Sequence, residues 1–321
     1  MLSITGMCML AWTGVLIDRV LGEPARWHPL VGFGRIANAL ERRLNPDHVN
    51  AGRRGMALPR LLGVLAWVAM VVIPAALAVL SVQLVPWPLA WALHALLLWF
   101  ALGARSLDEH IRPIAAALLA GDLVEARRLT ARIVSRDMSD ADAPAVARAA
   151  IESALENGND AIFGALFWFA LAGGPGALAF RLANTLDAMW GYRTPRLLHF
   201  GWAAARIDDG LNWLPARLTA LAYALCGNAR SAWRCWRRQA RAWDSPNAGP
   251  VMASGAGSLQ VLCGGAARYH GAMEARPVLG MGAVPDGHDV RRAINLVQRA
   301  LYLWLGLQTL LGLAVFLIRQ S

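Results

Sequence analysis

The sequence contains no lysine and few charged residues of any kind. All 31 basic residues are arginine, and charged residues make up 16% of the 321 positions. The lack of lysine excludes a lysine Schiff base and a P-loop, whose lysine contacts the phosphates. The hydrophobic content of 57%, which includes 14 tryptophans, is too high for an ordinary soluble domain. We therefore predict an all-α, polytopic integral membrane protein.

Cysteine is also scarce. The chain has only four cysteines, far apart and without a CxxC pair, so the pattern indicates neither a zinc site nor a disulfide framework. The four are Cys8, Cys226, Cys235 and Cys263.

The formal net charge of +10 would suggest a nucleic-acid partner in a soluble protein. Here the arginines cluster beside apolar runs, where they orient membrane helices. We expect no nucleic-acid partner. The expected partner is the lipid bilayer of the bacterial inner membrane, crossed several times.

The clearest apolar run is Leu61 to Val85, long enough to cross ~30 Å of hydrocarbon at ~1.5 Å per residue. A second run, Pro88 to Ala104, returns after a short turn at Pro86, so the two predict an antiparallel hairpin. Arginines flank both open ends, which places those ends on the cytoplasmic side. These arginines are Arg42, Arg43, Arg53, Arg54, Arg60, Arg105 and Arg112.

In total we expect about four to six membrane-embedded helices. The first, residues 2–17, has no clean cleavage site and predicts an uncleaved anchor; the last is Leu301 to Ile318. Glycine and proline interrupt the middle runs, Ala161 to Phe180 and Leu211 to Cys226, which are either full spans or re-entrant half-helices. We favour half-helices, which would keep residues 181–210 and the site on the cytoplasmic side.

We interpret residues 1–321 as a single membrane-embedded domain with five successive parts. They are N-terminal spans (1–104), a cytoplasmic helical region (105–160), a central site-bearing region (161–226), a cytoplasmic segment (227–300) and a C-terminal span (301–321).

A charged stripe follows a helix expected to begin near Pro144. Arg148, Glu152, Glu156 and Asp160 recur every four residues and so share one face. One interpretation is a solvated ladder of salt bridges. The other is a carboxylate cluster at the membrane face that binds Mg²⁺ together with substrate phosphates.

The central region carries two further polar sets. Arg181, Asn184 and Asp187 are spaced by three, and Asp208 lies one turn from Asn212, with Asp209 and Arg206 nearby. Paired carboxylates can hold a metal or act as acid and base, and arginines can grip phosphate or carboxylate. Internal ion pairing within a helix bundle is the alternative. We favour function because polar groups are costly beside lipid.

The segment Asp244 to Pro250, DSPNAGP, has the composition of a turn. Its backbone N–H groups could bind an anion, with Asn247 contacting substrate, or the segment is a plain connector.

Together these segments resemble the adenosylcobinamide-phosphate synthase family of cobalamin biosynthesis over nearly the whole length. Six motifs carry the resemblance: DRVLGEPARWHPLVGFGR (18–35), SRDMSD (135–140), ARAAIESALENGND (147–160), GGPGALAFRLANTLDAMWGYR (173–193), FGWAAARIDDGLNWLPARLTAL (200–221) and DSPNAGPVMASGAGSLQVLCGG (244–265).

The resemblance implies an ATP-dependent amide ligation. A propionate carboxylate of adenosylcobyric acid would join (R)-1-amino-2-propanol or its O-phosphate, giving adenosylcobinamide or its phosphate; which amine is preferred stays open. Activation of the carboxylate as an acyl phosphate calls for ATP, Mg²⁺ and cationic groups. Other membrane enzymes of late cobalamin assembly are conceivable partners, as is a second copy of the chain.

Roles are assigned from residue chemistry at positions that match the family. The expected catalytic residues are Asp208, Asp209, Asp187 and Glu156. The expected metal ligands are Asp187, Asp208, Asp209 and Asp160. The expected substrate-binding residues are Arg181, Asn184, Arg206, Asn212, Arg217 and Asn247.

Two departures from the family pattern weaken the case for a catalytic loop near residue 158. The family usually reads close to ENTSDG where this chain has Gly158 and Asn159, and commonly has threonine where Met138 stands. A non-enzymatic membrane signalling or assembly protein on the same scaffold is the rival hypothesis. A transporter is disfavoured because the polar residues concentrate in one central region.

Overall fold

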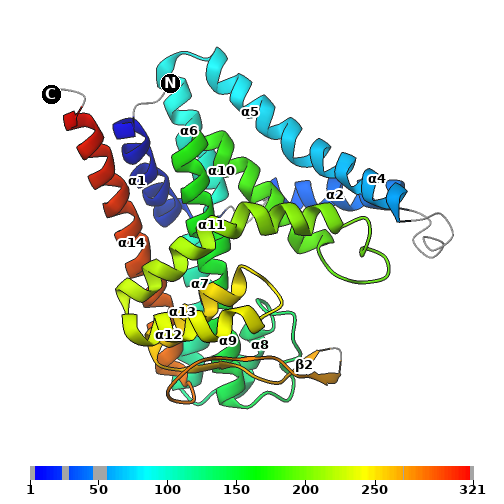
Figure 1. The fold of residues 1–321 in the computed structure, drawn as a ribbon, viewed down its shortest axis with the longest axis vertical. Helices are drawn as coiled ribbons and strands as arrows, with labels where there is room; N and C mark the ends of the chain where they lie inside the picture. The colour runs from blue at the N-terminus through cyan, green and yellow to red at the C-terminus, as the bar shows by residue number, and fades with distance from the viewer. Residues whose placement is uncertain (1–3, 24–28, 46–55, 270, 319–321) are drawn as a thin grey trace. The chain divides into compact units, whose positions relative to one another are not determined.

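The structure is a computed structural model that describes residues 4–23, 29–45, 56–269 and 271–318. Arg53, Arg54 and positions 24–28 of the first motif lie outside the described residues. Helices dominate the described part, which confirms the predicted all-α polytopic class (Figure 1). Five helical stretches there are long and apolar enough to cross a membrane: Ile4–Leu21, Ala57–Leu84, Trp87–Leu119, Ala143–Trp190 and Gly287–Ile318.

The chain forms two compact units, each built from two separate segments. The first comprises Met1–Gly103 and Gly164–Asn212, and the second Ala104–Phe163 and Trp213–Ser321. We predicted that residues 1–321 form a single domain. Whether the two units together form that domain stays a prediction.

The regular secondary structure in the described part of the first unit is all helical. Its elements are α1 (Ile4–Leu21), α2 (Pro29–Leu44), α4 (Ala57–Trp67), the π-helical turn η2 (Val68–Val72), α5 (Ile73–Leu84), α6 (Trp87–Ala101), α10 (Gly164–Trp190) and the start of α11 (Trp202–Cys226).

The second unit combines helices with two short antiparallel strand pairs. Its elements are α7 (Ala104–Leu119), α8 (Leu123–Thr130), α9 (Ala143–Gly158), η3 (Asn159–Phe163), the rest of α11, α12 (Ala229–Gln239), η4 (Ala240–Ala242), α13 (Ala248–Leu259), β1 (Leu262–Gly264), β2 (Ala267–Tyr269), β3 (Ala272–Glu274), β4 (Val278–Gly280) and α14 (Gly287–Ile318).

In the first unit α6 packs against both α1 and α10. Gly14 permits the close approach of α1, because a Cβ there would lie 2.6 Å from Leu98 Cδ2. A second cluster joins α4, η2 and α10 through buried residues that include Ala66, Leu186 and Trp190. This cluster holds the end of α10 in place, where the candidate site begins.

A kink interrupts α10 where the sequence GGPG predicted a break. Gly173 adopts φ 66°, ψ −158°, and Pro175 has no N–H to continue the helical hydrogen bonds. The N–H of Gly174 donates instead to Nδ1 of His94 on α6, at 2.9 Å. The buried histidine therefore satisfies a backbone group that the kink releases.

The second unit is built around α9, which contacts α7, α13, α14 and β1. The helix begins as predicted: Asp142 accepts a hydrogen bond from the N–H of Ala145, and Pro144 lies in the first turn. The residues of α13 are all buried. Its Gly255 lets α9 approach closely, since a Cβ there would lie 2.6 Å from Leu155 Cδ2.

The antiparallel strand pairs β1–β4 and β2–β3 were not predicted from the sequence. Each strand has three residues and no clear alternation of polar and apolar side chains. The pairs nevertheless position Gly264 and Arg276 beside α9, which matters for the charged residues described below.

The other predicted spans correspond to helices as follows. Leu61 to Val85 corresponds to α4, η2 and α5, and Pro88 to Ala104 to α6. The run Leu211 to Cys226 forms the second half of α11, which is not one of the five candidate spans among the described residues. The choice between spans and half-helices for the two middle runs stays a prediction.

Candidate functional site

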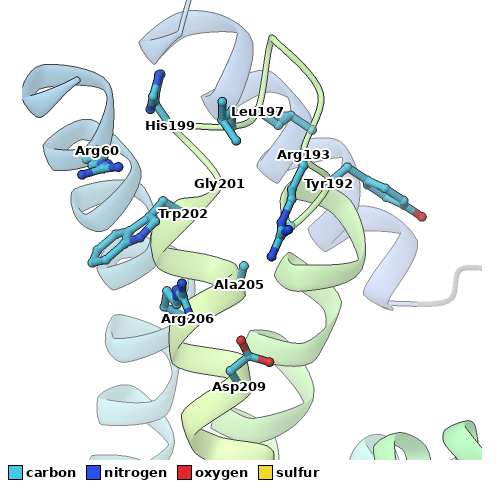
Figure 2. A pocket seen from close by; sticks show the side chains of 12 residues that line it. Arg60, Tyr192, Arg193, Leu197, His199, Gly201, Trp202, Ala205, Arg206 and Asp209 are labelled. Carbon is cyan, nitrogen blue, oxygen red and sulfur yellow. The ribbon is translucent and has the colours of Figure 1, made fainter. Parts of the chain in front are cut away.

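A cavity of about 400 Å³ opens in the first unit between α4, the loop after α10 and the first turns of α11 (Figure 2). Arg60, Arg193, Arg206 and Asp209 contribute its charged side chains. In Figure 2 Arg193 extends from the loop into the space that the Asp209 carboxylate also faces. Two of the predicted site residues, Arg206 and Asp209, therefore belong to one pocket.

Glycines at both ends of the loop allow it to fold this tightly. A Cβ at Gly191 would lie 2.1 Å from Asp187 Oδ1, and a Cβ at Gly201 would lie 1.8 Å from the carbonyl oxygen of Trp190. The Gly191 N–H donates to the Asp187 carbonyl at 2.7 Å. The GYR and FGW motifs thus bring the end of α10 and the start of α11 to the pocket.

The pocket carries more positive than negative charge. Three arginines and a single carboxylate line it, and the Arg60 guanidinium lies 5.4 Å from the centre of the Trp202 ring, in a cation–π contact. Burial raises the pKa of the Asp209 carboxyl, opposed by Arg206 and Arg193. Such a pocket suits a phosphate or carboxylate ligand, because arginine can donate two parallel hydrogen bonds to either.

Asp208, next to Asp209 on α11, is buried and belongs to a separate polar trio. Its Oδ2 accepts a hydrogen bond from Asn212 Nδ2 at 3.0 Å, and its Oδ1 accepts one from Asn184 Nδ2 at 3.5 Å. Asp208 is 8% exposed and Asn212 1%. Three residues predicted from their spacing therefore come together.

The other two predicted residues on α10 lie near this trio in the sequence but have different surroundings. Arg181 forms an ion pair with Glu23, at 3.8 Å between Nη2 and Oε1. Asp187 is half-buried and its carboxylate packs beside Gly191. Neither lines the pocket.

Mg²⁺ is expected to take one or two carboxylates together with substrate phosphates. Within the described ranges no three acidic, histidine or cysteine side chains form a group that could hold a metal ion. Asp208 offers a single carboxylate, a ligand that Mg²⁺ can take together with substrate phosphates, and the amide nitrogens of Asn184 and Asn212 face it. The metal assignment stays a prediction.

In the second unit, Asp160 Oδ1 accepts a hydrogen bond from Asn159 Nδ2 at 2.9 Å. Asn159 in turn accepts from Thr219 Oγ1 at 3.0 Å, and Glu156 lies half-buried one turn earlier. The alternative of a solvated ladder on this helix is wrong, because Glu152 is 2% exposed. Arg136, Arg276 and the Gly264 N–H contact the Glu152 carboxylate on this face.

Arg217 and Asn247, both predicted to bind substrate, contact each other. Arg217 Nη1 donates to Asn247 Oδ1 at 2.7 Å, and its guanidinium lies 4.6 Å from the centre of the Trp213 ring. The Asn247 and Ala248 N–H groups donate to Ser245 Oγ at 3.3 and 3.1 Å. These bonds favour the connector interpretation of residues 244–250 over an anion cradle.

Sequence reasoning missed Arg60, Arg193 and Trp202 as pocket residues. The signal for two of them was present, because Arg193 ends the motif at 173–193 and Trp202 lies in the motif at 200–221. Arg60 belongs to α4 and reaches the pocket only through packing of distant segments.

A family model described as CobD/Cbib protein matches residues 11–297. A curated relative in Chromobacterium violaceum, named cobalamin biosynthesis protein CobD, is 54% identical over 293 residues, covering 91% of this chain and 93% of the relative. Relatives of the same name in Stutzerimonas stutzeri and Mycobacterium tuberculosis are 55% and 43% identical, with 91% and 88% of this chain covered and 93% and 88% of the relatives. No solved structure matches. The chain belongs to the CobD/CbiB family.

Proposed function

We propose that this chain is an enzyme of cobalamin biosynthesis that forms an amide bond. The substrates are adenosylcobyric acid and (R)-1-amino-2-propanol or its O-phosphate, and the product is adenosylcobinamide or its phosphate. The names of the relatives support the pathway. The resemblance of the motifs supports the reaction.

The arginine-lined pocket of the first unit is the observation that best supports the proposed reaction. An amide ligation driven by ATP brings together a carboxylate, a phosphoryl group and an amine, so its site needs cationic groups and few competing carboxylates. Arg60, Arg193 and Arg206 line the pocket with a single carboxylate, Asp209.

In this proposal ATP transfers its γ-phosphoryl group to the corrin carboxylate, which gives an acyl phosphate and ADP. Asp208 would hold Mg²⁺, which would offset phosphate charge. Arg193 and Arg206 bind the anionic groups, and Asn184 and Asn212 hold Asp208 in position. Asp209 accepts a proton from the ammonium group of the substrate, and the neutral amine then attacks the acyl carbon and releases inorganic phosphate. Each role is assigned from the chemistry of the side chain, which is cationic for the arginines, anionic for the aspartates and neutral and polar for the asparagines.

A complementation experiment tests the proposal. A bacterium that lacks the synthase step is given this gene and fed either cobyric acid or cobinamide under cobalamin-dependent growth. We expect growth on both supplements. Growth on cobinamide alone would reject synthase activity and leave the rival hypothesis of a signalling or assembly protein.

We further propose that the protein lies in the bacterial inner membrane with this pocket on the cytoplasmic side. A cysteine introduced at Thr194, in the loop after α10, reports the side through its reaction with a membrane-impermeant thiol reagent. We expect labelling only after the cells are opened. Labelling of intact cells above the background of the unmodified chain would contradict the proposal.

A further inference from the structure

A second charged cavity, of about 330 Å³, lies entirely within the second unit. The SRDMSD segment, the start of α9, residues of β1, β2 and β3, and Arg276 line it. The segment at 135–140 is one of the motifs that carry the family resemblance, and the proposed reaction gives it no role. Four arginines line this cavity: Arg136, Arg148, Arg268 and Arg276.

Glu152, behind the cavity, fixes two of these arginines. Its Oε2 accepts hydrogen bonds from Arg136 Nη2 at 2.5 Å and Arg276 Nη1 at 3.1 Å, while its Oε1 accepts from the Gly264 N–H at 2.7 Å. The side chains of Arg136 and Arg276 are 11% and 12% exposed. The two guanidinium groups are therefore held in place before any ligand arrives.

Arg148 adds a third positive charge without a matching carboxylate. It lies one helical turn before Glu152, yet it makes no ion pair or hydrogen bond with any other described residue. The inner wall thus has three arginines for one carboxylate.

The buried Cys263 thiol lies close to these charged groups. Burial raises its pKa and Glu152 raises it further, whereas Arg148, Arg136 and Arg276 lower it. The charges of Glu152 and of the three arginines therefore all act on the pKa of this one side chain on β1.

The acidic residues at the outer edge have partners of their own. Asp137 accepts hydrogen bonds from Ser139, Asp142 caps α9, and Asp140 pairs with Arg268 at 2.7 Å. Asp140 is also largely exposed, at 76%. These carboxylates leave the inner arginines available to an incoming anion.

We propose that this cavity binds the phosphoryl group of a small phosphorylated substrate, with Arg148 as the principal ligand and Arg136 and Arg276 as fixed neighbours. Guanidinium groups match phosphate oxygens through paired hydrogen bonds. The volume is at the small end of ligand pockets, which suits a phosphorylated amino alcohol or the phosphate end of a nucleotide. The choice of these two phosphorylated compounds rests on the proposed function.

Binding to the purified full chain in detergent tests the inference without turnover. Titration calorimetry with inorganic phosphate, (R)-1-amino-2-propanol O-phosphate and ATP with Mg²⁺ is compared for wild type, Arg148→Gln and Arg148→Lys. Arg132→Gln is the matched control, because Arg132 is an exposed arginine that does not line the cavity. Thermal unfolding verifies that each variant is folded.

We expect Arg148→Gln to weaken binding of at least one phosphorylated probe tenfold or more, Arg148→Lys to weaken it less, and Arg132→Gln to leave it unchanged. The probe most affected identifies the source of the phosphoryl group. Unchanged affinity of both Arg148 variants for all three probes would overturn the inference, as would a wild type that binds none. Because growth on cobyric acid is measured separately, a failed complementation with intact, Arg148-dependent binding would reject the proposed function alone.

Discussion

The two units each surround a carboxylate with arginines, but they do so in opposite ways. In the second unit the Glu152 carboxylate is buried and holds Arg136 and Arg276. In the first unit Asp209 is half-exposed and shares an open pocket with three arginines. The same residue types therefore give a buried ion-pair cluster around Glu152 in one unit and, around Asp209 in the other, an open pocket that we propose binds anions.

Burial accounts for this difference. A buried ion pair contributes little net stability relative to apolar packing, but loss of one partner leaves a charge without compensation. A half-exposed pair costs less to separate, so a substrate can replace one charge with another. Substitution of Glu152 should therefore affect stability, whereas substitution of Asp208, next to Asp209 on α11, should affect activity.

The largest expected effect is the loss of stability in Glu152→Gln. Removing this charge leaves Arg136 and Arg276 buried without their anion, so we expect the free energy of unfolding to fall by about 3–5 kcal/mol. Thermal or denaturant unfolding in detergent measures it. Glu125→Gln is the control, since Glu125 pairs with Arg128 at an exposed position, and its loss should change stability far less. Equal losses in the two variants would remove the contrast.

Asp208→Asn should affect activity instead. We expect amide formation to fall roughly hundredfold, about 2.7 kcal/mol, because the variant keeps the shape of the trio but loses the charge that would hold Mg²⁺. Initial rates measure this, and the unfolding midpoint should stay near that of wild type. Glu109→Gln, in an exposed pair with Arg105, should match wild type in both. A fully active Asp208→Asn would remove this residue from the site.

Arg193→Gln should weaken substrate binding. The loss of one charge-assisted contact to an anionic group predicts a KM increase of about tenfold, with a smaller change in kcat. Steady-state kinetics with each substrate varied in turn will identify the group that Arg193 binds. Arg43→Gln, an exposed arginine of α2, provides the control, and an unchanged KM for every substrate would contradict the assignment.

The smallest effect concerns pH. Because burial raises the pKa of Asp209, the folded state binds this proton more tightly than the unfolded state does. Stability should therefore decline as pH rises from the ordinary aspartate value of about 3.9 through the higher folded value. Asp209→Asn should lack this part of the decline. Unfolding midpoints of both proteins between pH 4 and 7 measure the difference, and parallel curves would contradict it.

Much of the fold could be predicted from local sequence. The apolar runs Leu61 to Val85 and Leu301 to Ile318 predicted two membrane helices, and Pro144 predicted the start of α9. The helices extend beyond these runs, to 57–84 and 287–318. The sequence GGPG predicted the kink at Gly173 because glycine and proline act on the local backbone. The strand pairs that position Gly264 and Arg276 beside α9 could not be predicted, because strand pairing depends on contacts between separate segments.

The candidate site was predicted in part for the same reason. Spacing along α11 correctly placed Asp208 one turn from Asn212, which share a hydrogen bond. It could not identify Arg60, which reaches the pocket from another helix. A four-residue spacing also looks the same on an exposed and on a buried helix face, so it could not distinguish the buried Glu152 from a solvated ladder.

The most direct measurement follows oxygen from the corrin carboxylate. The purified chain is given adenosylcobyric acid labelled with ¹⁸O in the reacting carboxylate, together with ATP, Mg²⁺ and the amine. Activation as an acyl phosphate transfers one ¹⁸O atom to inorganic phosphate for each amide formed, and we predict that Asp208→Asn lowers the rates of both products by the same factor. Amide formation without ¹⁸O in the phosphate, or no amide from the wild-type chain, would contradict the account.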